Sequence, residues 1–300
     1  MQHKLLNMKN IAFIVNPKAG IKTKNRVVKL VKELLDLQQF SPTVVATEYP
    51  GHATQLAQQF ALEGYYAVIA VGGDGTVNEV ASGIVGTDTA LGIVPNGSGN
   101  GFARHLDIST RMNRAIEMLN TSESINVDYC KVNDIPYFSI CGVGFDAIVA
   151  QDFAQTTRGL KGYIQSIFKD IFQYKPETYH ITGQDIDITT KAFLVNFANA
   201  SQWGYEAHIA PKASIQDGWI DVAIVSEFPL VKAPGLAWQL FTKNIDENLY
   251  VNTIHAKEIT IHRENNASPV HVDGTPTKID GDLHIKIIED GLKVLVKKRF

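Results

Sequence analysis

Hydrophobic and polar positions alternate in two distinct ways along this chain, and the change comes near residue 128. In the first part, strand-length apolar runs are separated by segments that place apolar residues at helical spacing. The apolar runs are residues 11–15, 43–47, 66–71 and 91–95, and the helical segments are residues 25–37, 53–64 and 78–85. Nearly continuous apolar strands between helices predict a parallel sheet covered on both faces. Ligands of such sheets bind beyond the carboxyl ends of the strands.

The pattern of the second part predicts many short strands in which apolar and polar residues alternate. Such a series of strands is typical of an antiparallel sandwich. Its first two strands meet at a turn at Asn133-Asp134. One helical segment, residues 160–174, either packs on this part or lies on a membrane. We therefore expect two domains, residues 1–128 and 129–300, with the C-terminal tail packing back on the first domain. The cleft between two such domains is the natural place for an active site.

Composition and charge narrow the functional classes. Of the 300 residues, 45% are hydrophobic, as in an ordinary globular protein. The formal net charge of −3 gives no electrostatic basis for nucleic-acid binding. Cys130 and Cys141 lack the spacing of a disulfide framework or a zinc site, so we expect two reduced thiols. No apolar stretch is long enough to span a bilayer, and the N-terminus does not resemble a signal peptide, so we expect a cytoplasmic protein whose membrane contact is peripheral.

Three glycine-bearing loops follow strands at one edge of the predicted sheet, at residues 16–20, 72–76 and 97–101. The middle loop, Gly-Gly-Asp-Gly-Thr, is the most specific, because a helix cap explains one acid but not three glycines around it. Glycines let a ligand approach the backbone, and the start of the following helix favours an anion. Asp74 either holds a metal ion on a triphosphate or orients a neighbouring loop. Together the three loops predict a nucleotide site.

The motifs NPKAG, GGDGTVNEV and PNGSGNGFAR, in this order, resemble the diacylglycerol kinase catalytic-domain family. That family includes sphingosine, ceramide and bacterial lipid kinases and shares its nucleotide-binding fold with NAD kinases. Two later segments, residues 210–225 and 270–276, are also similar to the family, so the resemblance covers nearly the whole chain. It implies an α/β fold with an NAD kinase-like parallel-sheet nucleotide domain and a C-terminal antiparallel β-sandwich domain for the lipid.

The resemblance also implies which residues bind ATP. They are Asn16, Pro17, Lys18, Ala19 and Gly20 of the first loop, Thr47 after the second strand, Gly72, Gly73, Asp74, Gly75, Thr76, Val77 and Asn78 of the middle loop, and Ser98 of the third loop. Mg²⁺ is the implied metal cofactor.

Asp273 is the implied catalytic base for the lipid hydroxyl. The chain contains a second Asp-Gly pair, Asp280-Gly281, and a β-hairpin turn is the ordinary explanation of either pair. The family pattern favours Asp273, because it directly follows a strand-like run. Thr275 stands where the family usually has a glutamate. This difference leaves open the alternative that the chain is a nucleotide-binding protein that has lost catalysis.

Some bacterial relatives hold a structural Mg²⁺ in the second domain. Ser214, Asp217 and Trp219 occupy the matching positions here. Ser214 offers a neutral oxygen where a carboxylate is expected, so an Asp-Gly turn leading into the next strand is an equal interpretation. We expect the histidines of the late strands, His262, His271 and His284, to face solvent.

We conclude from the sequence that the chain is an ATP- and Mg²⁺-dependent lipid kinase, with diacylglycerol as the first acceptor to consider. The alternatives are a sphingoid, ceramide or other lipid kinase, an NAD kinase-like enzyme, and a nucleotide-binding protein without catalysis. The expected partner is a lipid at a membrane surface, on the inner face of the membrane. The sequence predicts no nucleic-acid partner and leaves a homodimer open.

Overall fold

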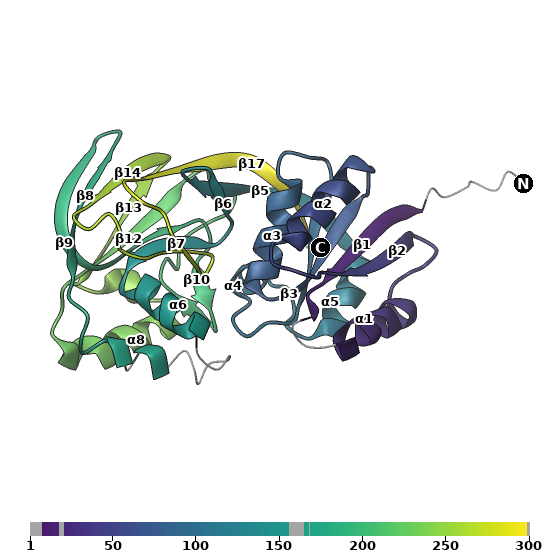
Figure 1. Cartoon of the computed structure of the whole chain (residues 1–300), viewed down its shortest axis with the longest axis horizontal. Helices are drawn as coiled ribbons and strands as arrows, with labels where there is room; N and C mark the ends of the chain where they lie inside the picture. The colour runs from purple at the N-terminus through teal and green to yellow at the C-terminus, as the bar shows by residue number, and fades with distance from the viewer. Residues whose placement is uncertain (1–7, 18–20, 156–164, 168, 299–300) are drawn as a thin grey trace, which may run out of the picture. The chain divides into compact units, whose positions relative to one another are not determined.

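The computed structural model describes residues 8–17, 21–155, 165–167 and 169–298 (Figure 1). The chain divides into two compact units. Unit 1 consists of the chain up to Val127 together with the segment from Asp290 onward, and unit 2 consists of Asp128–Glu289. Each unit is described by itself below.

Unit 1 contains a parallel sheet with strand order β17-β4-β3-β1-β2. The strands are β1 (Lys9–Val15), β2 (Phe40–Ala46), β3 (Ala67–Gly72), β4 (Ala90–Pro95) and β17 (Leu283–Lys297). The helices are α1 (Ile21–Leu34), α2 (His52–Leu62), α3 (Asp74–Ile84), α4 (Gly101–His105) and α5 (Met112–Leu119). Helices α2 and α3 pack together on one face of the sheet, and α1 and α5 on the other (Figure 1).

The apolar pattern explains this layering. Every residue of β3 and β4 is buried, as expected of strands covered on both faces. Helix α2 buries Ala53, Ala57 and Phe60, which recur at helical spacing, while its glutamines are exposed. The parallel sheet covered on both faces, predicted from the sequence, is confirmed.

Unit 2 is mostly antiparallel. Its strands are β5 (Ser122–Val132), which begins in unit 1, β6 (Ile135–Tyr137), β7 (Ile140–Gly144), β8 (Glu177–Gly183), β9 (Ile186–Ala198), β10 (Gln202–Gly204), β11 (Ala207–His208), β12 (Ile220–Ser226), β13 (Val251–Ala256), β14 (Glu258–Arg263), β15 (Val270–Val272) and β16 (Thr275–Thr277). The main order is β16-β15-β7-β9-β8-β14-β17, and β12 pairs with β9 and β13. Its helical segments include α6 (Phe145–Gln155), η2 (Leu230–Lys232), α8 (Ala233–Thr242) and η3 (Ile245–Glu247).

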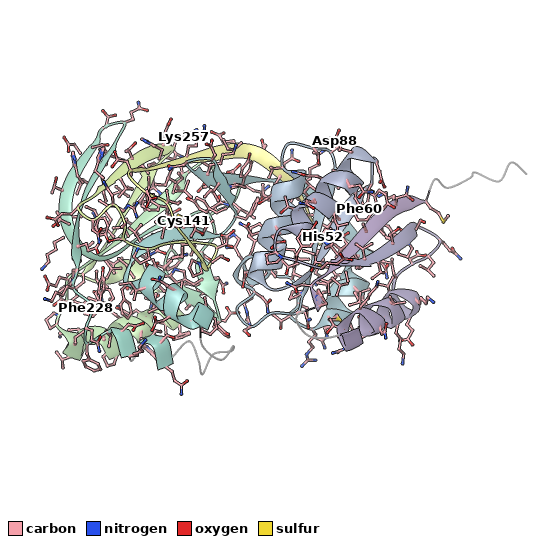
Figure 2. All side chains as sticks on the ribbon, in the orientation of Figure 1. His52, Phe60, Asp88, Cys141, Phe228 and Lys257 are labelled. Atoms are coloured by element: carbon pink, nitrogen blue, oxygen red, sulfur yellow. The ribbon has the colours of Figure 1, made fainter. Side chains whose placement is uncertain are left out.

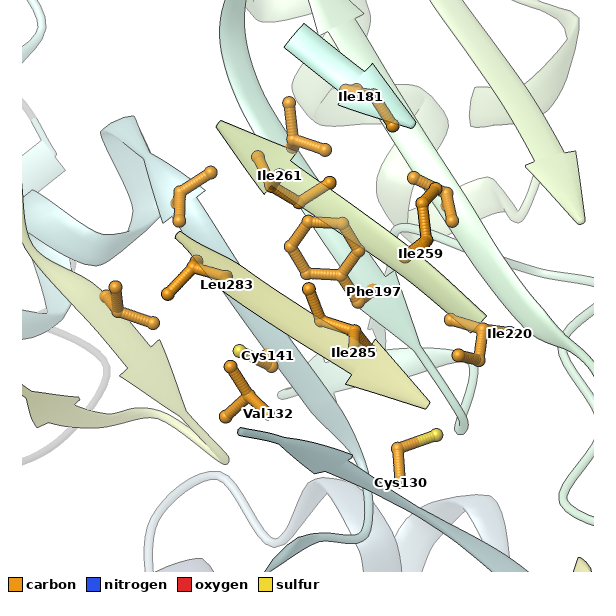
Figure 3. Packing of buried hydrophobic residues seen from close by; sticks show 14 of the residues in the cluster. Cys130, Val132, Cys141, Ile181, Phe197, Ile220, Ile259, Ile261, Leu283 and Ile285 are labelled. Carbon is orange, nitrogen blue, oxygen red and sulfur yellow. The ribbon is translucent and has the colours of Figure 1, made fainter. Parts of the chain in front are cut away.

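The core of unit 2 is an apolar cluster between these strands. Phe197 of β9 belongs to it, together with Ile259 of β14 and Ile285 of β17, which pair across the two strands (Figure 3). Cys130 and Cys141 belong to the same cluster, and both are free and buried. Burial raises the pKa of both thiols above the ordinary range, so they behave as apolar packing groups rather than as nucleophiles.

A second apolar cluster lies under the helices of unit 2. Phe145 of α6, Phe193 of β9 and Leu236 of α8 contribute to it, and Phe228, labelled in Figure 2, packs against it. Ile167 and Ile171 also pack against this cluster, in the segment 160–174 for which a helix is predicted. Residues 160–164 and 168 of that segment lie outside the described residues.

Candidate functional site

The carboxyl ends of four strands meet side by side in unit 1, and the predicted nucleotide loops begin there. Hydrogen bonds between neighbouring strands continue past the strand ends into these loops. The Thr47 N–H donates to the carbonyl of Val15 (3.0 Å), and the Asn16 N–H to that of Val71 (3.1 Å). The Asn96 N–H donates to the carbonyl of Gly72 (2.7 Å). The loops after β1, β2, β3 and β4 are therefore adjacent along one sheet edge.

The first loop is tied to the middle loop by a side-chain hydrogen bond. The Asn16 amide Nδ2 donates to Thr76 Oγ1 at 3.0 Å. Thr76 is buried in the first turn of α3, so the bond fixes the first loop against the start of that helix. Pro17 follows directly, whereas Lys18, Ala19 and Gly20 lie outside the described residues.

The middle loop is tied to the third loop by Asp74, the first residue of α3. Its Oδ2 accepts the N–H of Asn100 at 2.8 Å, and its Oδ1 accepts the N–H of Gly101 at 2.7 Å. Bonds from backbone N–H groups to a carboxylate are among the stronger hydrogen bonds in proteins. Of the two roles open to Asp74 at the sequence level, the structure shows the orienting of a neighbouring loop.

Two glycines let the middle and third loops touch backbone to backbone. A Cβ on Gly97 would lie 2.4 Å from the Cα of Gly73, and a Cβ on Gly73 would lie 3.2 Å from the Cα of Gly97. Gly72 has a similar constraint, since its Cβ would lie 2.4 Å from Thr76 Oγ1. The sequence predicts that these glycines let a ligand approach the backbone. The structure adds another reason for them: side chains at these positions would separate the loops.

The remaining predicted nucleotide residues differ in exposure. Ser98 and Gly75 are exposed at the loop edge, Asn78 is half-buried, and Thr47 is buried at the end of β2. Val77 is buried on the inner side of α3, so its side chain packs against the unit rather than facing the loops.

Two residues outside the predicted nucleotide-binding set organise the third loop. Asn100 has a left-handed backbone with φ of 53° and exchanges hydrogen bonds with Gly97 through its side-chain amide. Arg104 donates from Nε to the carbonyl of Gly99 at 3.1 Å. The Gly-Ser-Gly-Asn pattern could have signalled Asn100, because asparagine tolerates this backbone conformation better than most residues.

Asp273 lies in unit 2, in the turn of a two-residue hairpin. Val272 of β15 pairs with Thr275 of β16, and the residues between them, Asp273 and Gly274, have φ angles of 48° and 73°. Positive φ at both turn positions is the type I′ geometry that Asp-Gly favours. Asp273-Gly274 therefore forms a β-hairpin turn, which is the ordinary explanation of an Asp-Gly pair.

Backbone hydrogen bonds also hold the carboxylate of Asp273. Its Oδ1 accepts the N–H groups of Ser139 (2.8 Å) and Ile140 (3.1 Å), and its Oδ2 accepts that of Phe138 (3.0 Å). Phe138 and Ser139 lie in the break between β6 and β7, and Ile140 is the first residue of β7. They hold the carboxylate in one orientation.

The second Asp-Gly pair is built differently. Asp280 is exposed and lies 3.6 Å from the Lys278 ammonium, whereas the carbonyl of Gly281 accepts a 2.7 Å hydrogen bond from the buried Arg263 guanidinium. Arg263 also donates to the carbonyl of Ile279 at 2.6 Å. This pair is therefore a loop fixed through its backbone, whereas three N–H donors hold the carboxylate of Asp273.

One histidine prediction is wrong. His271 of β15 is buried rather than exposed, and its Nε2 lies 2.8 Å from Asp146 Oδ2, also buried. Asn196 donates to the same carboxylate oxygen at 2.7 Å and accepts a bond from Trp203 at 2.8 Å. The alternation of β15 did not reveal this because both faces of the strand are covered. His262 and His284 are partly exposed, as predicted.

The residues predicted to hold a structural Mg²⁺ take part in local turns. Asp217 Oδ1 accepts the N–H of Trp219 at 3.1 Å, and Ser214 Oγ accepts that of Gln216 at 3.3 Å. Burial raises the pKa of the nearby Asp221 to about 6, although His255 opposes the shift. Within the described part of the chain, no three His, Cys, Asp or Glu side chains are grouped to hold a metal ion. The turn interpretation has direct support, and the metal site stays a prediction.

Comparison with known proteins places this arrangement in a family. A model of the diacylglycerol kinase catalytic domain matches residues 10–132. A model of the YegS C-terminal NAD kinase beta sandwich-like domain matches residues 139–295, more than half of the chain. The chain belongs to the diacylglycerol kinase family.

Individual relatives agree with this membership. A Staphylococcus saprophyticus protein named diacylglycerol kinase is 30% identical, over 75% of this chain and 75% of its own length. A Serratia proteamaculans protein named "Probable lipid kinase YegS-like" is 26% identical, over 85% of this chain and 84% of its own length. A Synechocystis protein is 28% identical over 93% of this chain, and the match spans 64% of that relative, which is less than two thirds of it.

A solved structure has the same fold as this chain. The crystal structure of a diacylglycerol kinase from Bacillus anthracis str. Sterne matches with a TM-score of 0.72 over 97% of both chains, at 21% identity. The predicted family, the two-part fold class and the enzyme class, that of the lipid kinases, are confirmed. No helix in the described ranges is long and apolar enough to cross a bilayer.

Proposed function

We propose that this chain is an ATP- and Mg²⁺-dependent lipid kinase that transfers the γ-phosphate of ATP to a lipid hydroxyl, with diacylglycerol as the acceptor. The observation that carries the proposal is the set of joined loops in unit 1. Asn16, Thr76 and Asp74 connect the three loops at the carboxyl ends of parallel strands. Such an edge is where ligands of parallel α/β sheets bind.

In this proposal the loops bind the phosphates of ATP. The N-terminus of α3, which begins at Asp74, directs backbone N–H groups and the positive end of the helix dipole toward the loops. Lys18 of the first loop adds a positive charge, and Thr47 and Ser98 add hydroxyl donors. Because hydrogen bonds and close backbone contacts already join the loops, little ordering is needed when the nucleotide binds.

The described residues do not supply a protein ligand set for Mg²⁺. Both carboxylate oxygens of Asp74 accept backbone N–H bonds, and no group of three His, Cys, Asp or Glu side chains in those residues is placed around a metal position. Mg²⁺ keeps several waters and is commonly held by substrate phosphates, so it would arrive with ATP. When bound, it neutralises charge on the phosphates during transfer.

Asp273 is the proposed base, which accepts or orients the proton of the lipid hydroxyl. Three N–H donors hold its carboxylate in one orientation, and a fixed orientation is what a general base requires. The same bonds favour a second candidate function, in which Asp273 only clamps the hairpin to β7 and the protein binds nucleotide without catalysis.

Asp273→Asn separates these two functions, with Asp280→Asn as the matched control. As a base, Asp273 contributes about a hundredfold or more to kcat, so Asp273→Asn should lower kcat with diacylglycerol by at least that factor. ATP affinity should stay within about twofold, because in this proposal Asp273 acts on the acceptor hydroxyl and does not bind the nucleotide phosphates. Asp280→Asn should leave both unchanged. Thermal unfolding of each variant checks that the loss is not one of folding.

Unchanged turnover in folded Asp273→Asn would show that Asp273 is not the base. Loss of turnover in Asp280→Asn instead would assign the base to the second Asp-Gly pair. If the wild-type protein binds ATP and phosphorylates no lipid, the nucleotide-binding protein without catalysis becomes the better description.

A further inference from the structure

Helix α8 carries apolar residues on all sides, yet little of it is buried. Its sequence is Ala-Pro-Gly-Leu-Ala-Trp-Gln-Leu-Phe-Thr, with two polar side chains. Leu236 is buried in the apolar cluster of unit 2, and Leu240 packs partly against it. A helix that is apolar all round is normally enclosed on all sides. The outer side of α8 therefore has the composition of a surface that something covers.

The outer residues form one continuous face. Pro234, Trp238 and Phe241 follow one another at spacings of four and three residues, which places them on the same side of a helix. Trp238 is 69% exposed and Phe241 is 52% exposed, and Val231 of the preceding turn η2 is 83% exposed. We call these four residues the α8 face. Single exposed apolar side chains are ordinary, but a run that includes two aromatic rings marks an interaction surface.

The chain segment that carries the α8 face is basic. The segment 229–244 contains Lys232 and Lys243 and no carboxylate. The nearest acidic residues along the chain on either side are paired: Glu227 lies 2.8 Å from Lys191, and Asp246 lies 2.7 Å from Lys212. A tryptophan and a phenylalanine between two lysines complement a bilayer with anionic lipid: the rings lie among the headgroups and the ammonium groups reach the phosphates.

We propose that the α8 face docks unit 2 on the surface of an anionic lipid bilayer. The helix has ten residues and lies in the interface rather than crossing it. This inference rests on the proposed function, because a kinase of a bilayer lipid must work at the bilayer surface. It adds the part of the chain that makes the contact, and it assigns the contact to α8 rather than to the segment 160–174.

Vesicle binding by the full chain tests the inference. Wild type, Trp238→Gln/Phe241→Gln and Leu62→Gln are sedimented with vesicles of phosphatidylcholine, with and without phosphatidylglycerol. Leu62 of α2 in unit 1 is 90% exposed and is the matched control. The double variant should partition to vesicles at least about tenfold more weakly than wild type, and the control should not differ from it. Lys232→Gln/Lys243→Gln should weaken binding only to vesicles that contain phosphatidylglycerol.

Three control measurements separate a loss of vesicle binding from a loss of folding or of self-association. ATP affinity without vesicles, thermal unfolding and sedimentation velocity without lipid are compared for wild type and the double variant, and the first two should agree. Unchanged partitioning of the folded double variant overturns the inference. A wild-type dimer that becomes monomeric in the double variant, with vesicle binding unchanged, also overturns it and assigns the face to a second copy. Vesicle binding is scored without turnover, so failure of the lipid-kinase proposal is recognised separately, by the absence of a phosphorylated lipid.

Discussion

At the residue scale, the unusual composition of the loops in unit 1 has a structural cause that the sequence only partly reveals. The three glycines around Asp74 indicate, from the local sequence alone, that side chains are excluded from this loop. What excludes them is the facing loop: Gly73 and Gly97 are 24 positions apart in the chain but touch in the fold. Contacts between distant segments leave no local pattern, and the buried pair of His271 and Asp146, 125 positions apart, is a second example.

Gly97→Ala tests the contact between the loops. The new Cβ would lie 2.4 Å from the Cα of Gly73, and backbone atoms cannot move aside as a flexible side chain can. We expect ATP affinity to fall by about tenfold or more, measured by titration calorimetry. Gly235→Ala in α8 is the control, because a Cβ there meets nothing within 4 Å. Equal affinity in the two variants would contradict the loop contact.

Gly142→Ala tests the buried polar network of unit 2. Its Cβ would lie 2.6 Å from both Asp146 Oδ2 and His271 Nε2, so the hydrogen bond between them must break or the strand must shift. Breaking a buried, hydrogen-bonded pair costs about 3 kcal/mol or more of unfolding free energy. Urea denaturation measures the loss. A loss below about 1 kcal/mol would show that the network yields easily.

At the scale of elements, the hydrophobic pattern predicts where most strands and helices occur, and the exceptions have identifiable causes. The buried strands β1, β3 and β4 are predicted by their apolar runs. Helix α8 is missed because Pro234 and Gly235 resemble a turn, although proline is well tolerated in the first turn of a helix. The pattern predicts short strands in the second part, but β17 has 15 residues and runs through Asp290-Gly291 without ending.

Asp74→Asn tests the connection between the starts of α3 and α4. The carboxylate accepts N–H groups from both Asn100 and Gly101, and an amide offers only one accepting atom. The remaining N–H then loses its partner, so we expect a loss of about 1–3 kcal/mol in stability and a weaker affinity for ATP. Thermal unfolding and nucleotide titration measure the two effects. Asp88→Asn, at a fully exposed carboxylate of the same unit, is the control and should change neither.

At the scale of the whole molecule, unit 1 is assembled from two distant parts of the chain. The segment from Asp290 onward belongs to it, and β17 extends its sheet beside β4, where Val294 pairs with Leu91. Leu292, Val294 and Leu295 of this segment are buried. The apolar pattern predicts a strand there, but the pairing partner follows from the fold and not from the pattern.

Leu295→Ala tests this assembly. Leu295 has no exposed surface, so its truncation should lower the free energy of unfolding of unit 1 by about 2–5 kcal/mol. Urea denaturation followed by the signal of a bound fluorescent nucleotide reports on this unit. Leu249→Ala, at a leucine that is 99% exposed, is the matched control. Identical midpoints for both variants would contradict a structural role of the C-terminal segment in unit 1.

The central claim is that this member of the diacylglycerol kinase family phosphorylates a lipid with ATP. The most direct test incubates the purified chain with ATP, Mg²⁺ and, in separate reactions, diacylglycerol, a sphingoid base, ceramide, phosphatidylglycerol and NAD, and identifies the product by mass. We predict a phosphorylated diacylglycerol that is absent when ATP is omitted. A phosphorylated NAD, or no phosphorylated lipid from folded protein that binds ATP, would contradict the claim.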